Sequence, residues 1–333
     1  TATQVGEEFP RFSAFYIEKP VAGAEVVRIW ATMDSPSVTG AYQFVINPGR
    51  ATRMDVTARL FLRQDIQRLG IAPLTSMFLF GENNRSAFRD YRSAVHDSDG
   101  LKIVRANGEQ VWRSLNNPAR LAMSFIGEEN PRAFGLFQRD RKFENYQDAE
   151  AWYERRPSAL VEPLDQWGKG TVALVEIPTD LEVNDNIVAF WVPEGDMRAG
   201  QSLEFRYRLS WGELDEGESN LARVVSLRGG HGGVSGTAND PSQQKFVIDF
   251  KGSALDGIPP DSKELESIVR VEQAELVRSA LSYVPANDVW RLVIDIAPTG
   301  NRPVELNAFL SQEGTRVSEI WFYQWRAEDE RAG

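Results

Sequence analysis

Residues 53–63 read RMDVTARLFLR, and this stretch decides the fold class that the sequence predicts. Its apolar side chains alternate with polar ones and only Phe61 breaks the pattern; they are Met54, Val56, Ala58, Leu60 and Leu62. Residues 203–210, LEFRYRLS, alternate in the same way. Successive side chains of a β-strand point to opposite faces, so this alternation places one face on a core and the other in water. Such strands are typical of antiparallel sheets.

Further strand-like runs follow at short intervals, with turn-forming residues between them. They are residues 26–33, 41–46, 121–125, 133–138, 171–177, 187–193, 245–250, 289–296, 304–310 and 318–325. This spacing predicts an all-β protein built of sandwiches rather than βαβ units. Helical signals are few. Residues 147–155 predict a helix, with Asp148 near its start and Pro157 as a stop, and residues 64–69 are compatible with one or two helical turns. Residues 264–278 are charge-rich, but their β-branched side chains favour strand.

The acidic segment GELDEGESN, residues 212–220, is the predicted domain boundary because it is almost free of apolar side chains. Residues 1–211 are then part of a large β-sandwich. Residues 221–333 carry strand-like runs at the spacing of a smaller immunoglobulin-like sandwich. Residues 228–243, RGGHGGVSGTANDPSQ, have no core-forming pattern and predict a long surface loop, of the kind that is usually functional or disordered.

The composition excludes several classes of function. Lys and Arg number 37 against 48 Asp and Glu, which gives a net charge of −11 and makes the chain a poor binder of nucleic-acid backbones. There is no cysteine and there are only two histidines, so a disulfide, a thiol nucleophile and a His-rich metal site are excluded. No run approaches the roughly 20 apolar residues of a membrane span. Residues 1–8 lack the features of a signal peptide, so we expect any such peptide to be missing from this chain.

Carboxylates remain as the main candidates for chemistry. Residues 95–100, VHDSDG, form either a simple turn, a catalytic or binding site, or a calcium loop that does not complete an EF-hand. Residues 178–186, PTDLEVNDN, lie between two predicted strands and form either a plain hairpin loop or a support that presents Asp185 into a groove. Two carboxylates that meet from remote positions are the minimum for glycosidic cleavage, one as acid and the other to activate water.

Aromatic residues share the same part of the chain: Trp112, Trp152, Tyr153, Trp167, Phe190 and Trp191. Flat rings can stack on the apolar faces of sugars, but they can equally be the core of a large sandwich. Trp152 and Tyr153 are the exception. The charged residues that follow them make a position in the core harder to explain.

Eight stretches carry a resemblance to a known family. They are GEEFPRF (6–12), IAPLTSMFLFG (71–81), YR…HDSDGL (91–101), VWRSLNNP (111–118), FGLFQRDRKF (134–143), YERRPSALVEP (153–163), WGKGTVALVEIPTD (167–180) and NDNIVAFW (184–191). With these motifs the chain closely resembles the bacterial periplasmic glucan biosynthesis proteins OpgG and OpgD, also called MdoG and MdoD. The resemblance is dense over residues 6–211 and thinner over 219–325. Family members usually begin with a signal peptide and a further β-rich segment, which we expect this chain to lack.

The resemblance implies a large sandwich of the kind found in carbohydrate-active enzymes, followed by an immunoglobulin-like domain. It also implies work on the β-1,2-linked backbone of osmoregulated periplasmic glucans, as an inverting endo-β-1,2-glucanase or a transglycosylase. Asp185 is then the general acid and Asp97 the general base, with Asp99 as the alternative base. Tyr153 matches a tyrosine that lines the glucan cleft. The other predicted glucan-binding residues are Trp152, Arg156, His96, Trp112, Trp167 and Asn186.

The alternative function is a non-catalytic glucan-binding scaffold that hands the backbone to membrane-bound glucan synthesis proteins. Under either function the implied location is the periplasm, the implied ligand is β-1,2-glucan, and no cofactor or metal ion is expected. An acid at Asp185 must be kept protonated by burial or by a nearby carboxylate. An inverting pair normally stands about 6.5–9.5 Å apart. Residues 228–243 match a variable loop of relatives and are a candidate lid.

Overall fold

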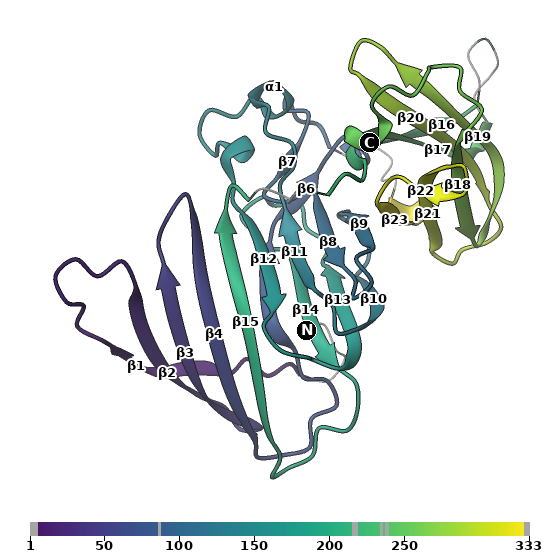
Figure 1. The fold of residues 1–333 in the computed structure, drawn as a ribbon. Coiled ribbons are helices and arrows are strands. Elements are labelled where there is room, and N and C mark those ends of the chain that lie inside the picture. Colours follow the sequence, from purple (N-terminus) through teal and green to yellow (C-terminus); the bar gives the residue numbers. More distant parts are fainter. Residues whose placement is uncertain (1–5, 86–87, 215–218, 234–235, 237–239, 330–333) are drawn as a thin grey trace.

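Strands make up most of the computed structural model, which describes residues 6–85, 88–214, 219–233, 236 and 240–329 (Figure 1). The largest sheet has 13 strands. Its hydrogen-bonded order is β1 (Arg11–Ile17), β2 (Val27–Asp34), β3 (Val38–Asn47), β4 (Ala51–Leu62), β15 (Ser202–Gly212), β12 (Ser158–Pro163), β11 (Ala133–Phe137), β8 (Gly100–Val104), β9 (Gln110–Ser114), β23 (Ile320–Trp325), β21 (Val304–Gln312) and β18 (Leu265–Glu272). The short β22 (Thr315–Arg316) pairs with β21. The all-β prediction is confirmed.

Three smaller sheets complete the fold. One has the order β10 (Ala122–Glu129), β13 (Lys169–Glu176), β14 (Ile187–Pro193) and β5 (Ile71–Ser76); another has β16 (Arg223–Gly232), β17 (Asp240–Lys251), β20 (Val289–Pro298) and β19 (Ala274–Val284); β6 (Phe78–Phe80) and β7 (Val95–His96) form a ribbon. The described helices are short: α1 (Phe143–Tyr146), η2 (Tyr153–Arg155), η3 (Ser253–Leu255) and η4 (Ala327–Asp329). No helix in the described ranges is both long and apolar enough to cross a membrane.

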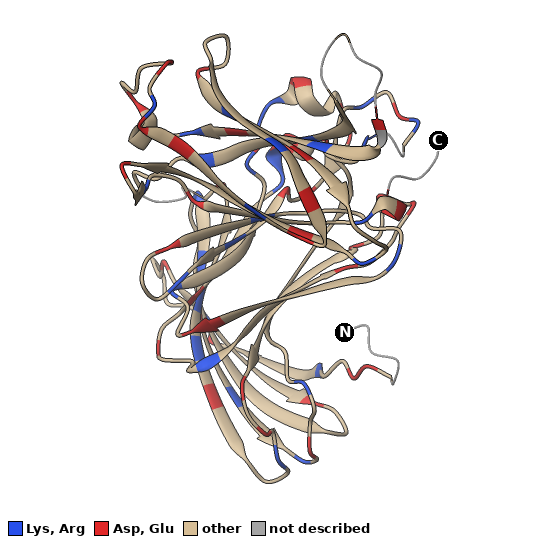
Figure 2. Ribbon diagram, turned by 90° about the vertical axis from the view of Figure 1, so that its right-hand side faces the viewer, with Lys and Arg blue, Asp and Glu red and all other residues tan. Residues whose placement is uncertain are grey.

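Strand β4 shows why the alternating sequence folds as it does. Val56, Ala58, Leu60 and Leu62 are buried. Val56, Leu60 and Leu62 pack in one core with buried residues of the β10–β13–β14–β5 sheet such as Leu174. The opposite face carries cross-strand ion pairs between β4 and β15. In the view of Figure 2 basic and acidic positions are interspersed along the described strands rather than gathered in one stripe. Each face of the strand thus has the environment that its side chains need.

The C-terminal strands have a second core, between the β16–β17–β20–β19 sheet and the β23–β21–β18 end of the large sheet. The two parts share one hydrogen-bonded sheet, because β23 pairs in parallel with β9 through Ile320 and Val111. The predicted boundary at residues 212–220 therefore remains a prediction: hydrogen bonds cross between its two sides, and residues 215–218 of the linker lie outside the described ranges.

Two helical predictions are wrong. Residues 147–155 do not form one helix, because Gln147 (φ 58°) and Trp152 (φ 51°) both adopt the left-handed conformation, which no α-helix can continue through. Asp148 instead accepts hydrogen bonds from the backbone N–H groups of Glu150 and Ala151, which closes a turn. Residues 64–69 form bends and a single bridge from Ile66 to Met197. Residues 264–278 do lie in strands, β18 and β19, as their β-branched residues indicate.

The predicted loop at residues 228–243 is also largely wrong, because β16 extends to Gly232 and β17 begins at Asp240. Close packing explains one of the glycines, Gly229. A Cβ atom on Gly229 would lie 2.2 Å from the carbonyl oxygen of Asn83, so a larger residue could not pair there. Of the intervening segment, residues 234–235 and 237–239 lie outside the described ranges, and the lid remains a prediction.

Gly135 gives the sharpest test of strand packing. A Cβ atom there would lie 2.2 Å from the backbone oxygen of Ala159 on β12. We expect Gly135→Ala to lower the free energy of unfolding by about 1–3 kcal/mol or more, because strand backbone must move. Gly127→Ala on β10 is the matched control, since no atom lies within 4 Å of its Cβ position. Urea unfolding of both variants checks this, and equal stabilities would contradict it.

Candidate functional site

The β6–β7 ribbon supports the predicted motif at residues 95–100. Its side chains form a small core with Tyr146 of α1 and Tyr153 of η2. Asp97 follows β7 directly, and its N–H donates to the carbonyl of Met77 at 2.8 Å. In Figure 1 the ribbon and α1 lie beyond the upper ends of β11 and β12, on the side toward the C-terminal strands. Residues from distant parts of the sequence are thus brought to one place.

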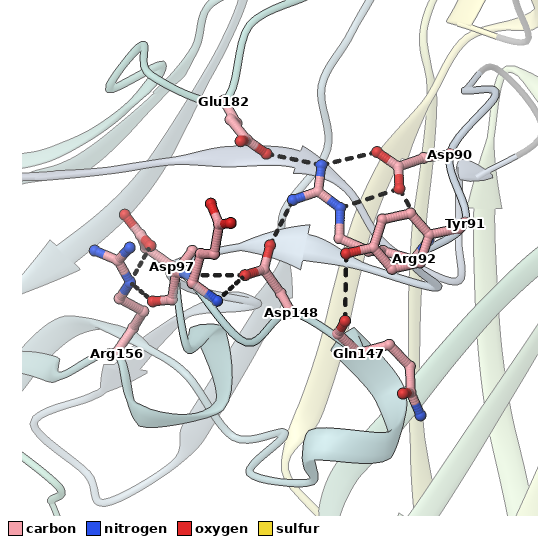
Figure 3. Close-up of polar contacts among 10 residues, drawn as sticks. Asp90, Tyr91, Arg92, Asp97, Gln147, Asp148, Arg156 and Glu182 are labelled. Atoms are coloured by element: carbon pink, nitrogen blue, oxygen red, sulfur yellow. Dashed lines mark hydrogen bonds and ion pairs between the residues drawn. The ribbon is translucent and has the colours of Figure 1, made fainter.

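Asp97 is half-buried and forms an ion pair with Arg156, whose Nε atom lies 3.2 Å from Oδ1 (Figure 3). Burial raises the pKa of Asp97, the positive charge of Arg156 lowers it, and the negative charge of Asp185 raises it again. The net direction is upward. The negative charge of Asp185, the partner that the resemblance assigns to Asp97, thus contributes to the raised pKa of Asp97 in the folded chain.

Asp185 itself is exposed, on the loop between β13 and β14. Of the two ways to keep an acid protonated, burial or a nearby carboxylate, burial does not apply to Asp185 in this structure. The start of the loop is held by two hydrogen bonds. The side-chain amide of Asn117 donates to the carbonyl of Thr179 and accepts from the N–H of Thr179. Asn186 is buried at its other end and bonds the N–H and carbonyl of Phe78 on β6. Asn186 fixes the loop rather than facing solvent, so we leave it out of the proposed ligand contacts.

His96 is also buried, and its contacts hold the motif from beneath. Its ring stacks on Phe78 with 5.1 Å between centroids, and Nδ1 lies 2.9 Å from Oε1 of Gln138. The amide nitrogen of Gln138 donates to the carbonyls of His96 and Tyr153. This leaves Oε1 as an acceptor, so the neutral imidazole carries its hydrogen on Nδ1. His96 thereby ties β7 to η2 and acts as a positioning residue.

The state of His96 predicts an acid sensitivity. Burial lowers its pKa from 6.5 to about 4. Between these two pH values the unfolded chain binds a proton at His96 that the folded protein does not bind. The contribution of His96 to the free energy of unfolding is therefore complete above pH 6.5 and is lost as the pH falls toward 4. We expect His96→Gln to remove about 3 kcal/mol of this pH-dependent difference. His231→Gln is the control, since His231 is exposed; an unchanged pH slope in His96→Gln would contradict the expectation.

Tyr153 and Trp152 have different environments. Tyr153 is buried; burial and the negative charge of Glu182 raise its pKa, while the charge of Arg92 opposes them. Trp152 is partly exposed, with the guanidinium carbon of Arg155 at 4.0 Å from its ring centre. Its φ of 51° is uncommon for a bulky residue, and such conformations gather at functional sites. Trp152 therefore remains a candidate platform for a sugar ring.

Trp112 and Trp167 lie in the cores instead. Trp112 is 3% exposed, and the guanidinium of Arg139 covers its ring at 3.4 Å. Trp167 is 7% exposed and packs edge-on against Phe205 and Tyr207. Neither ring presents a face to solvent, so both side chains are better explained as packing than as ligand contacts.

Asp99, the alternative base, has a structural task. Its Oδ2 accepts hydrogen bonds from the backbone N–H groups of Arg139 and Asp140, both at 3.0 Å. Burial raises its pKa to about 7, although the charge of Arg139 opposes this. The charge of Asp185 contributes to the raised pKa of Asp97 and is not among the causes that raise the pKa of Asp99, which favours Asp97 as the candidate base.

Sequence reasoning missed the centre of the polar network, Arg92. Its guanidinium forms ion pairs with Asp90 at 2.8 Å, Asp148 at 2.7 Å and Glu182 at 2.9 Å (Figure 3). The one signal was the tyrosine–arginine pair at the start of the YR…HDSDGL stretch. Nothing in the sequence indicated that three carboxylates from three segments would meet there.

Comparison with known proteins identifies the family. A family model described as "Periplasmic glucan biosynthesis protein, MdoG" matches residues 1–325. Glucans biosynthesis protein G of Cereibacter sphaeroides is 56% identical over 98% of this chain and 60% of the relative. Probable glucans biosynthesis protein D of Shewanella oneidensis is 43% identical over 98% of this chain and 60% of the relative. Glucans biosynthesis protein G of Pseudomonas aeruginosa is 44% identical over 99% of this chain and 64% of the relative.

Both names, G and D, occur among these relatives, and the family resemblance inferred from the eight motifs is confirmed. The chain spans 60–64% of the length of these three relatives. The identity over nearly all of its own length leaves no doubt about descent: the chain belongs to the MdoG family of periplasmic glucan biosynthesis proteins.

Proposed function

We propose that the chain binds the β-1,2-glucan backbone and cleaves or transfers it, with Asp185 as general acid and Asp97 as general base. The observation that best supports the proposal is that Asp97 and Asp185 come from separate loops and that the negative charge of Asp185 contributes to the raised pKa of Asp97. A carboxylate pair of this kind is what glycosidic cleavage requires, one member to protonate the leaving oxygen and the other to activate water.

The environment of Asp97 suits a base. A catalytic base works best when its pKa lies near the working pH, and burial with the charge of Asp185 raises the pKa of Asp97 in that direction. Arg156 opposes the rise and favours the ionised form that must accept a proton. Asp185 is exposed, and a glucan lying over it would exclude water and favour the neutral carboxyl that an acid needs.

The side chains around this pair suit a neutral sugar polymer. Arg156 can donate to hydroxyl groups, whereas Tyr153 is buried in the small core below it. Trp152, on the turn that carries Arg156, and Tyr91, next to Arg92 in the chain, have exposed aromatic rings. We also propose that the sheets of residues 6–211 form a β-sandwich of the kind found in carbohydrate-active enzymes. Residues 221–329 would form an immunoglobulin-like sandwich. The protein would act in the periplasm.

Product analysis with linear β-1,2-glucan tests the proposal. Shorter linear products would support a hydrolase, and cyclic products a transglycosylase. The stereochemistry of the first product, followed by NMR, tests the inverting mechanism. Glucan that stays intact at every protein concentration would contradict the enzymatic proposal.

A glucan-binding scaffold is the second candidate function. Two observations favour it: Asp185 is open to solvent, and the charge of Asp97 is already paired with Arg156. A scaffold would bind glucan without changing it, and replacing either aspartate by asparagine would leave the affinity within a few-fold of the original. Calorimetric titration with linear β-1,2-glucan, run beside the product analysis, distinguishes the two functions.

A further inference from the structure

Arg92 lies between the two sides of the proposed site. Its side chain is 13% exposed, and it contacts Asp90 from its own segment, Asp148 from the turn before η2 and Glu182 from the loop between β13 and β14 (Figure 3). Hydrogen bonds and ion pairs with these carboxylates raise the pKa of Arg92 still further, so it is positively charged at every working pH.

On one side, Arg92 holds the turn that carries Arg156. Nη1 of Arg92 donates to Oδ2 of Asp148, while Oδ1 of Asp148 accepts from the N–H groups of Glu150 and Ala151. The carbonyl of Ala151 in turn accepts from Nε of Arg156 at 3.1 Å. A continuous chain of hydrogen bonds thus runs from Arg92 to the partner of Asp97.

On the other side, Arg92 holds the loop that carries Asp185. Glu182 is 45% exposed, and its Oε2 lies 2.9 Å from Nη2 of Arg92. Asn117 and Thr179 anchor the start of this loop, whereas Leu181 and Val183, on either side of Glu182, are exposed. The tip therefore has little packing of its own, and its ion pair with Arg92 joins it to the facing turn.

The acidic residues around Arg92 would repel one another without it. Asp90, Asp148 and Glu182 surround one guanidinium, and Asp97 and Asp185 add further negative charge nearby. Without Arg92 the like charges would repel the tip from the facing turn. Arg92 attracts the carboxylates on both sides and offsets their mutual repulsion. Both effects keep the tip of the β13–β14 loop close to the turn before η2.

We infer that Arg92 is a positioning residue that, through Glu182 and Asp148, sets the separation between Asp185 and Asp97. This inference rests on the proposed function. Because both reacting groups sit on loops, an error of about 1 Å in their separation can cost about a hundredfold in rate. The link should therefore govern turnover of bound glucan more than affinity for it.

Glu182→Gln tests the inference with little risk to folding, because Glu182 is at the surface. We expect kcat on linear β-1,2-glucan to fall about tenfold while KM changes less than twofold. Added salt should lower kcat of the wild type, since the pair is half-exposed, and should have little effect on the variant. Arg92→Lys, which keeps the charge but loses the fork geometry, should give an intermediate kcat.

Asp196→Asn is the matched control. It removes one of two carboxylates that Arg198 binds at the surface, Asp65 at 3.0 Å and Asp196 at 2.8 Å, so it copies the chemistry of Glu182→Gln elsewhere in the chain. It should leave kcat, KM and salt dependence unchanged. Equal effects of the two substitutions would overturn the inference.

Hydrogen–deuterium exchange separates this inference from the proposed function. Amides of residues 181–185 should exchange several-fold faster in Glu182→Gln than in the wild type, whether or not glucan is turned over. Faster exchange in a chain that never cleaves glucan would support the link and defeat the enzymatic proposal. Unchanged exchange together with unchanged kcat, in a chain that does cleave glucan, would overturn the link alone.

Discussion

Replacing Asp185 with asparagine is expected to lower the turnover of linear β-1,2-glucan by about 10²–10⁴-fold, the usual contribution of a positioned acid. An amide of the same shape cannot protonate the leaving oxygen, and because Asp185 is exposed the change should leave the fold intact. Asp97→Asn should cause a loss of the same order. The double variant should be little slower than either single variant, since the two groups serve one reaction. Product quantification over time measures all three.

Asp180→Asn is the control for Asp185→Asn, because it makes the same change at an exposed position of the same loop. It should retain most of the activity. Affinity for glucan, measured by calorimetry, should stay within a few-fold of the wild type in every variant. Wild-type turnover in Asp185→Asn would remove this residue from the acid role.

The second large effect is expected in stability, from Glu319→Ala. Glu319 is 0% exposed; its Oε1 accepts from Nη1 of Arg139 and from the N–H of Val224, both at 2.6 Å, and its Oε2 accepts from Nη2 of Arg139 at 2.9 Å. The substitution leaves a buried guanidinium without its carboxylate. Removal of one partner from a buried pair costs about 3–5 kcal/mol, and we expect that loss in the free energy of unfolding.

Glu204→Ala is the matched control for Glu319→Ala. Glu204 also pairs with an arginine, Arg59, but both side chains lie on an exposed strand face. Exposed pairs contribute about 0–1 kcal/mol, so this variant should unfold near the wild-type denaturant concentration. Similar losses in both variants would show that the Arg139–Glu319 pair does not stabilise the contact between the two parts of the chain.

The strands were predictable because their cause is local. In β4 and β15 the alternation of side chains reports directly which face meets the core. The missed turn at residues 147–152 has a different cause: Gln147 and Trp152 take left-handed conformations that neither residue type favours. The glycines among residues 229–233 indicated a loop. Gly229 instead lies in a strand, and only glycine fits there because the backbone of Asn83, from a remote segment, lies against it.

The candidate site was predictable where a motif carried it and unpredictable where packing decided it. Motifs pointed to Asp97, Arg156 and Asp185, and Asp97 does form an ion pair with Arg156, while the role of Asp185 remains a prediction. A tryptophan in sequence looks the same at a sugar-binding surface and in a core, and Trp112 proved to lie beneath Arg139. Arg92 could not be identified, because its three partners converge only after the loops have folded.

The parallel pairing of β9 with β23 has a consequence for how the chain is made. Ile320 joins Val111, so an edge of the large sheet stays open until more than two hundred further residues have been synthesised. Open edges of this kind invite pairing with other chains. Contacts so distant in sequence also form slowly, because a long loop must close first. The nascent protein therefore passes through a stage in which β9 is vulnerable to aggregation, and the arrival of β23 ends it.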